Sequence, residues 1–314
     1  MKIFRDYQFL PEESRGASVA IGNFDGVHLG HRVVLDKAKH AANASSASWG
    51  VLTFEPHPRE MFQPDAAPFR LMSSEARSHR LEKLGADCLF EIGFTKGLAG
   101  LTAEDFARDV LSEGLGLSHV TVGADFCFGK GRQGTAGTLT ELGAQFGFGV
   151  TIAELMKLPT GEVSSTAIRT ALTEGRPGDA AKMLGHWHRI DGPVIQGDQR
   201  GRDLGFPTAN MSIEGLHPPK FGVYAVLVDV LDGPHVGTYM GAASVGVRPT
   251  FGVNTPNIET FIFDFQGDLY GADVSVGLVE FLRPEEKYDS LDELITQMNA
   301  DCARAQSILS EKIG

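Results

Sequence analysis

Cysteine and basic residues are scarce in this chain of 314 residues, and each scarcity argues against a class of protein. The cysteines are Cys88, Cys127 and Cys302, which are far apart and not in CxxC spacing. This pattern argues against a disulfide framework or a zinc site and fits the cytoplasm. The net charge of −12 argues against nucleic acid or an anionic membrane as partner, since both bind basic surfaces. A local basic pocket for a small polyphosphate remains compatible with that charge.

Long apolar runs are also missing. No stretch has the length and composition of a membrane-spanning helix. Residues 1–16 lack the continuous apolar core and the small-residue cleavage site that define a signal peptide. We therefore expect neither nucleic acid nor a membrane as a partner, and we expect a monomer or a weak homo-oligomer.

The first half of the chain alternates short apolar runs with longer helical patterns. Continuous apolar runs are typical of parallel strands that helices cover on both faces. The expected strands are residues 18–21, 49–54, 88–92, 119–122 and 148–153. One expected helix begins after Thr102, an N-cap residue with Asp105 three positions later. The alternation predicts an α/β fold with a doubly wound parallel sheet that binds ligands at the carboxyl ends of its strands.

The second half is β-rich and predicts an antiparallel barrel or sandwich followed by one helix. The expected strands are residues 222–230, 239–247, 258–265 and 273–282. Ser290 and Glu293 have capping-box spacing at the start of the terminal helix, whose apolar stripe favours packing on the barrel. We place the domain boundary between residues 185 and 186, which gives domains 1–185 and 186–314.

The stretch "GNFDGVHLGH" places His28 and His31 one helical turn apart, directly after the first expected strand. Such histidines could be metal ligands, core residues or phosphate ligands. Few carboxylates and no cysteines surround them, which disfavours zinc. Backbone N–H groups at a helix start attract anions, and imidazole N–H groups donate to phosphate oxygens. The phosphate interpretation is therefore the best of the three.

The same stretch closely resembles the HxGH signature of nucleotidyltransferases, in the form found in bifunctional riboflavin kinase/FMN adenylyltransferases. The resemblance covers nearly the whole chain. Matching motifs of the adenylyltransferase module are "TFEPHP" (53–58), "GADFCFGKGRQG" (123–134) and "VSSTAIR" (163–169). Those of the kinase module are "GRDLGFPTAN" (201–210), "GVYAV" (222–226), "SVGVRPTFG" (244–252), "FDFQGDLYG" (263–271) and "FLRPEEKYDSLDEL" (281–294).

The resemblance implies that the first module joins FMN and ATP to give FAD and pyrophosphate. The implied ATP-binding residues are Gly22, Asn23, Phe24, His28, His31, Asp125, Ser164, Ser165, Thr166 and Arg169, with His28, His31 and Arg169 also catalytic. Residues His57 and Phe128 are implied to lie near the flavin. Taken alone, "SSTAIR" is equally compatible with an ordinary capped helix that carries a surface arginine. Without the resemblance, Phe128 would be assigned to the core.

The second module contains no GxxxxGK[ST] motif, so it is not a P-loop kinase. The resemblance makes "GRDLGFPTAN" an ATP site, formed by Gly201, Arg202, Gly205, Thr208 and Asn210. Thr208 and Asn210 would also bind Mg²⁺, because both carry neutral oxygen ligands. Taken alone, "PTAN" is merely a turn.

Glu259 stands among apolar or uncharged neighbours in an expected strand, and the resemblance makes it the general base and a flavin-binding residue. An exposed strand glutamate is the alternative.

Three functions are compatible with the whole chain. The first is phosphorylation of riboflavin to FMN and adenylylation of FMN to FAD, with ATP as co-substrate and Mg²⁺ as cofactor. The second keeps the kinase but gives the first module another adenylyl acceptor. The third is a flavin carrier without turnover, against which the intact motifs argue. The segment His186-Trp187-His188 departs from the arginine-proline-aromatic pattern common in the family at the domain junction.

Overall fold

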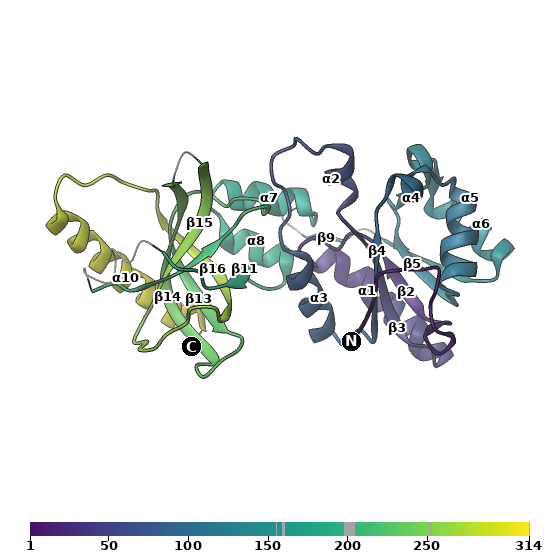
Figure 1. Ribbon diagram of the computed structural model, residues 1–314, viewed down its shortest axis with the longest axis horizontal. Helices are drawn as coiled ribbons and strands as arrows, with labels where there is room; N and C mark the ends of the chain where they lie inside the picture. The colour runs from purple at the N-terminus through teal and green to yellow at the C-terminus, as the bar shows by residue number, and fades with distance from the viewer. Residues whose placement is uncertain (155, 159–160, 198–204, 251–252, 314) are drawn as a thin grey trace. The chain divides into compact units, whose positions relative to one another are not determined.

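The computed structural model describes residues 1–154, 156–158, 161–197, 205–250 and 253–313. The chain forms two compact units, each of which is described by itself (Figure 1). The first unit consists of residues 1–66 and 74–163, and the second of residues 67–73 and 164–314. Among the described helices, none combines the length and the apolar composition that a membrane span needs.

The first unit contains a six-stranded parallel sheet in the order β1-β4-β3-β2-β5-β8. Its strands are β1 (Lys2–Phe4), β2 (Ser18–Ile21), β3 (Trp49–Glu55), β4 (Cys88–Gly93), β5 (His119–Gly123) and β8 (Gly149–Ala153). All five expected strands are confirmed to within one residue at each end, and β1 is additional. The chain reverses its direction of winding between β2 and β5, so their carboxyl ends form the switch point where such sheets bind ligands.

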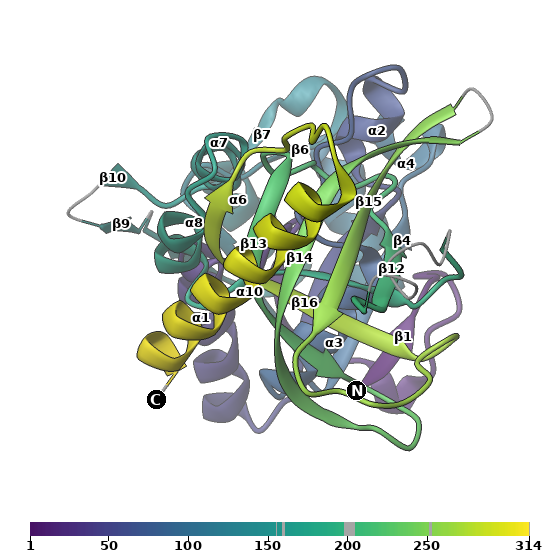
Figure 2. The same cartoon turned by 90° about the vertical axis from the view of Figure 1, so that its left-hand side faces the viewer.

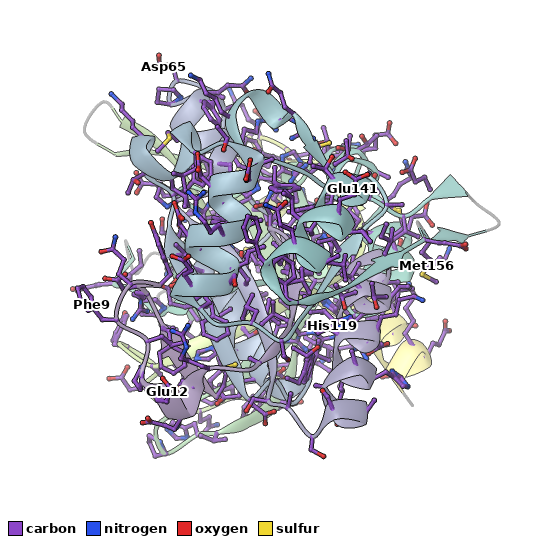
Figure 3. The ribbon with its side chains drawn as sticks, turned by 90° about the vertical axis from the view of Figure 1, so that its right-hand side faces the viewer. Phe9, Glu12, Asp65, His119, Glu141 and Met156 are labelled. Carbon is purple, nitrogen blue, oxygen red and sulfur yellow. The ribbon has the colours of Figure 1, made fainter. Side chains whose placement is uncertain are left out.

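Helices cover both faces of this sheet. The longer ones are α1 (Leu29–Ser45), α3 (Ser74–Lys83), the π-helix η2 (Phe106–Gly114) and α6 (Ala136–Phe146). The shorter elements are η1 (Glu12–Ser14), α2 (Pro58–Phe62), α4 (Lys96–Gly100), α5 (Ala103–Asp105), β6 (Cys127–Phe128), η3 (Lys130–Arg132), β7 (Gly134–Thr135), β9 (Lys157–Leu158) and β10 (Gly161–Glu162). Helix α6 buries Leu139 and Leu142 against the core and exposes Glu141 (Figure 3).

The expected helix after Thr102 is present, but it continues as a π-helix rather than an α-helix. The Thr102 hydroxyl accepts the Asp105 N–H at 3.1 Å, which confirms the cap. The wider winding ends at Gly114, where a Cβ atom would lie 2.7 Å from the Asp109 carbonyl oxygen. The Arg15 guanidinium donates to the Gly114 carbonyl at 2.8 Å and so satisfies this helix end.

The second unit contains a six-stranded antiparallel sheet in the order β11-β16-β13-β14-β15-β12. Its strands are β11 (His188–Pro193), β12 (Thr208–Ser212), β13 (Gly222–Val230), β14 (Gly237–Thr250), β15 (Val253–Ile262) and β16 (Asp273–Arg283). The Ile195 N–H donates to the Asn210 carbonyl at 2.8 Å and joins the two edge strands, so the sheet closes into a barrel.

The helices in the described part of this unit are α7 (Ser165–Thr173), α8 (Pro177–Leu184) and α10 (Leu291–Ile313). Helix α10 lies across β13 and β14 (Figure 2), and it buries Ala305 and Leu309 as its apolar stripe predicts. Asp301 of α10 accepts two N–H groups of Arg283 at the end of β16. The change between compact units at residues 163 and 164 precedes α7, whereas the boundary after residue 185 stays a prediction about the two functional modules.

His188 makes the stability of the second unit depend on pH. Burial, followed by the nearby His186 and His217, lowers the pKa of His188 to about 3. In the unfolded chain His188 becomes protonated near pH 6.5, whereas in the folded barrel it stays neutral down to about pH 3. The contribution of neutral His188 to the free energy of unfolding is fully present above pH 6.5. Below this pH the free energy of unfolding falls by at most about 1.4 kcal/mol per pH unit because of this group.

We predict that His188→Leu flattens this decline between pH 6.5 and 4.5. Urea unfolding at several pH values measures the slope, and His40→Leu at an exposed position of α1 is the matched control. Equal slopes for the parent and His188→Leu would show that His188 is not the responsible group.

Candidate active sites

The turn between β2 and α1, residues 22–28, is compact and strained. Phe24 and Val27 have positive φ angles of 51° and 43°, which cost such residues about 1–3 kcal/mol each. The Phe24 ring is buried beneath Gly22, where a Cβ atom would lie 3.1 Å from it. A conformation of this cost persists only where the surrounding structure fixes it, which marks the turn as a candidate functional site.

His28 and His31 meet at the start of α1. His28 is the N-cap residue, and its Nδ1 accepts the His31 N–H at 3.1 Å, which leaves Nε2 as the proton-bearing nitrogen. The two rings stack at a centroid distance of 3.5 Å with an interplanar angle of 14°. Gly30 makes room for the stack, since a Cβ atom there would lie 3.1 Å from the His28 ring.

The His31 ring is uncharged at neutral pH. Burial and then the neighbouring His28 hold its pKa well below 6.5. The edge of Phe24 faces the ring at a centroid distance of 5.3 Å, and His31 Nδ1 has no hydrogen-bond partner among the described residues. The neutral His31 ring, stacked on His28 beside the N-terminal N–H groups of α1, can therefore offer a donor to an anion.

Asp125 follows β5 and therefore lies at the same switch point as the histidine turn. The Phe126 N–H donates to the Gly123 carbonyl at 3.0 Å, which forms a turn that exposes Asp125. Phe128 is buried and contacts the rings of Phe126 and Phe106 at 5.5 and 5.7 Å. Phe128 is thus a core residue, and its contact with flavin stays a prediction.

His57 forms a capping box at the start of α2. Its Nδ1 accepts the Arg59 N–H at 3.1 Å, and Glu60 accepts the His57 N–H at 3.0 Å. This backbone role fixes the ring orientation. The flavin contact expected of His57 remains a prediction.

The "SSTAIR" residues belong to the second unit. Ser164 caps α7 by accepting the Ala167 N–H at 3.2 Å, as expected. Arg169 Nε donates to the Phe69 carbonyl at 2.6 Å, and its guanidinium lies 5.4 Å from the Phe69 ring. The sequence did not predict this contact, because residues 67–73 are distant in the chain and carry no motif. The roles of Ser165, Thr166 and Arg169 toward ATP stay predictions.

The barrel brings Asn210 and Glu259 together. They are directly opposed on β12 and β15, and Thr208 lies two residues along on the same face, opposite Phe261. Asn257 donates to Glu259 at 3.3 Å, which holds the carboxylate on this face.

Two described glycines, Gly197 and Gly205, border the expected ATP loop of the barrel. The backbone at Gly197 lies against Asn210, because a Cβ atom at this position would lie only 2.4 Å from Asn210 Nδ2. Gly205 has a φ of +83°, which favours glycine. The expected ATP ligands Gly201 and Arg202 lie outside the described residues.

Known protein families match both halves of the chain. The FAD synthetase family matches residues 10–167, and the riboflavin kinase family matches residues 184–309. The chain is 38% identical to the bifunctional riboflavin kinase/FMN adenylyltransferase of Pseudomonas fluorescens, with 98% of each chain covered. It is 37% identical to that of Escherichia coli K12, with 96% of each covered. The chain belongs to this bifunctional family.

A solved structure of similar fold carries a different name. The macrolide-efflux protein from Streptococcus pneumoniae superposes with a TM-score of 0.81 and is 31% identical, with 95% of this chain and 96% of that chain covered. The likeness extends over both halves, as it does for the bifunctional relatives. The efflux in this name refers to the Streptococcus pneumoniae protein.

Gly30→Ala tests whether the ring stack of this bifunctional family member matters. The added methyl group would press on the His28 ring, so we predict at least a tenfold loss of FAD formation from FMN. Gly137→Ala, at the same second position of α6, meets only an ordinary 3.7 Å contact and is the matched control. A Gly30→Ala enzyme with the parent rate would show that the stack tolerates displacement.

Proposed function

We propose that the histidine turn of the first unit carries adenylyl transfer to FMN, and that the Glu259 face of the barrel carries phosphorylation of riboflavin. One observation carries the first assignment: His28 stacks on a neutral His31 at a helix start, at the switch point of a parallel sheet. This geometry suits a polyphosphate, and the family supplies both reactions.

In adenylyl transfer, an FMN phosphate oxygen bonds to the α-phosphorus of ATP while the bond to the pyrophosphate oxygen breaks. No protein nucleophile is required. His28 Nε2 and the His31 ring donate to phosphate oxygens as negative charge accumulates, and the N-terminus of α1 adds its dipole. Gly22, Asn23 and Phe24 shape the turn, and Asp125 is proposed to bind the adenosine end. Positioning and electrostatic stabilisation supply the rate.

In the kinase reaction, the riboflavin alcohol attacks the γ-phosphorus of ATP and ADP leaves. Glu259 takes the proton from this alcohol during the attack. Its place opposite Asn210, with Thr208 on the same face, supports this role because base and phosphate ligands would then share one surface.

Mg²⁺ fits the donors of this surface. The described residues contain no group of three or more His, Cys, Asp or Glu side chains that could hold a metal ion alone. A hydroxyl and an amide oxygen, completed by ATP phosphates and water, match the oxygen coordination that Mg²⁺ prefers. Thr208 and Asn210 would hold the ion, which would neutralise phosphate charge. We further propose that both reactions occur in the cytoplasm.

A time course with riboflavin, ATP and Mg²⁺ tests the whole proposal. FMN should appear first and FAD second. FMN without FAD would favour another adenylyl acceptor for the first unit, and neither product would favour a flavin carrier.

His31→Ala should lower FAD formation from FMN about 10²–10³-fold, because it removes one donor to the transition state. FMN formation from riboflavin should be unchanged. Separation of FMN and FAD by chromatography measures both, and His40→Ala on the same helix is the control. Near-parent FAD formation by His31→Ala would refute the role of this ring.

Glu259→Gln keeps the side-chain shape and removes the proton acceptor. We predict a loss of about 10²–10⁴-fold in riboflavin phosphorylation, with FAD formation from supplied FMN retained. Glu280→Gln is the matched control, since Glu280 also lies on a barrel strand but pairs with Lys312 at 2.6 Å. A parent kinase rate in Glu259→Gln would exclude this residue as the base. Loss of both reactions in a folded protein would show that the two sites are not independent.

A further inference from the structure

Arg77 on α3 is a buried charged residue that the mechanism above does not use. Its side chain is 4% exposed and forms ion pairs with Glu55 at 3.1 Å and Glu91 at 3.0 Å. Glu91 is also buried, and its second oxygen lies 3.4 Å from Arg5 Nε. A charge cluster of this kind is costly to bury and is weak evidence for stability by itself.

A third contact of Arg77 reaches the histidine turn. Its Nη1 donates to the Asn23 carbonyl oxygen at 3.3 Å, and the Thr53 hydroxyl donates to the same oxygen at 3.4 Å. Asn23 directly precedes Phe24, the first residue with a strained positive φ angle. The guanidinium therefore holds the backbone where the strain begins.

The two glutamates fix the direction of this guanidinium. Glu55 ends β3 and Glu91 lies on β4, so both anchors belong to the rigid sheet. The planar fork of the guanidinium reaches both carboxylates through Nη2 and the carbonyl through Nη1, whereas lysine would have to meet all three acceptors from a single nitrogen.

We propose that Arg77 is a positioning residue for adenylyl transfer, which transmits the rigidity of β3 and β4 to the turn that presents His28 and His31. The proposal rests on the adenylyl-transfer function. Displacement of reacting groups by about 1 Å typically lowers the rate about 10²-fold. We therefore expect loss of the hydrogen bond from Arg77 to Asn23 to lower the rate of adenylyl transfer about 10- to 100-fold.

The decisive variant is the full-length double substitution Arg77→Met with Glu91→Gln. Arg77→Met alone leaves Glu91 buried without its main partner, whereas the double variant removes both charges. We expect the double variant to unfold at the parent urea concentration and to keep riboflavin phosphorylation. Its kcat for FAD formation should fall 10- to 100-fold, with KM for FMN changed less than about threefold. Lys83→Met, at an exposed position of α3, is the matched control and should keep the parent kcat.

Three outcomes would overturn the proposal. The first is a parent kcat for FAD formation in the double variant, and the second is a loss that merely follows the fraction of folded protein. If the double variant does not fold, Arg77→Lys decides, because it keeps the buried charge but loses the fork. A parent kcat in Arg77→Lys is the third contrary outcome, and an intermediate kcat supports the proposal. A parent protein that makes no FAD from FMN would instead refute adenylyl transfer itself.

Discussion

The packing of His28 against His31 at the start of α1 is the interaction on which the first site depends. It requires an N-cap residue whose ring accepts the third helical N–H, a glycine beneath the ring, and a turn that bends through two strained residues. Each requirement alone is unfavourable or unremarkable. Together they place two imidazole rings beside the N-terminal N–H groups of α1, where an anion is a suitable ligand.

The candidate phosphate site of the barrel is positioned in a different way. It uses the register of β12 against β15 rather than a helix start, and this register sets Asn210 opposite Glu259. Because side chains alternate along a strand, a slip of one residue would send this glutamate to the other face. The long, regular pairing of β14 with β15 fixes which face of the sheet Glu259 occupies, and the pairing of β12 with β15 then sets Asn210 opposite it.

Much of the fold could be predicted from the sequence because buried parallel strands are continuous apolar runs. β3 and β4, for example, appear directly as "WGVLTF" and "CLFEI". The edge strand β1 was missed, since three residues with one charge give no period. The π-helix was also missed, because an apolar stripe predicts a helix without distinguishing its winding.

Site residues could be predicted where they belong to a sequence motif. They could not be predicted where their role depends on a contact with a residue far away in the chain. The capping role of Ser164 follows from its residue type, but the contacts of Arg169 with Phe69 and of Arg77 with Asn23 join residues far apart in the chain. Composition also cannot separate a core aromatic from a ligand contact, as the burial of Phe128 illustrates.

Ring NMR during an ATP titration shows directly whether the stacked histidines bind phosphate. The His28 and His31 signals, assigned from the single alanine variants, are followed in full-length protein as ATP and Mg²⁺ are added without flavin. If both rings bind the phosphates of ATP, both ring signals should shift along one saturating curve. The Glu259→Gln substitution should leave this shift unchanged. Rings that stay unmoved while ATP saturates the protein would contradict phosphate binding by the histidines.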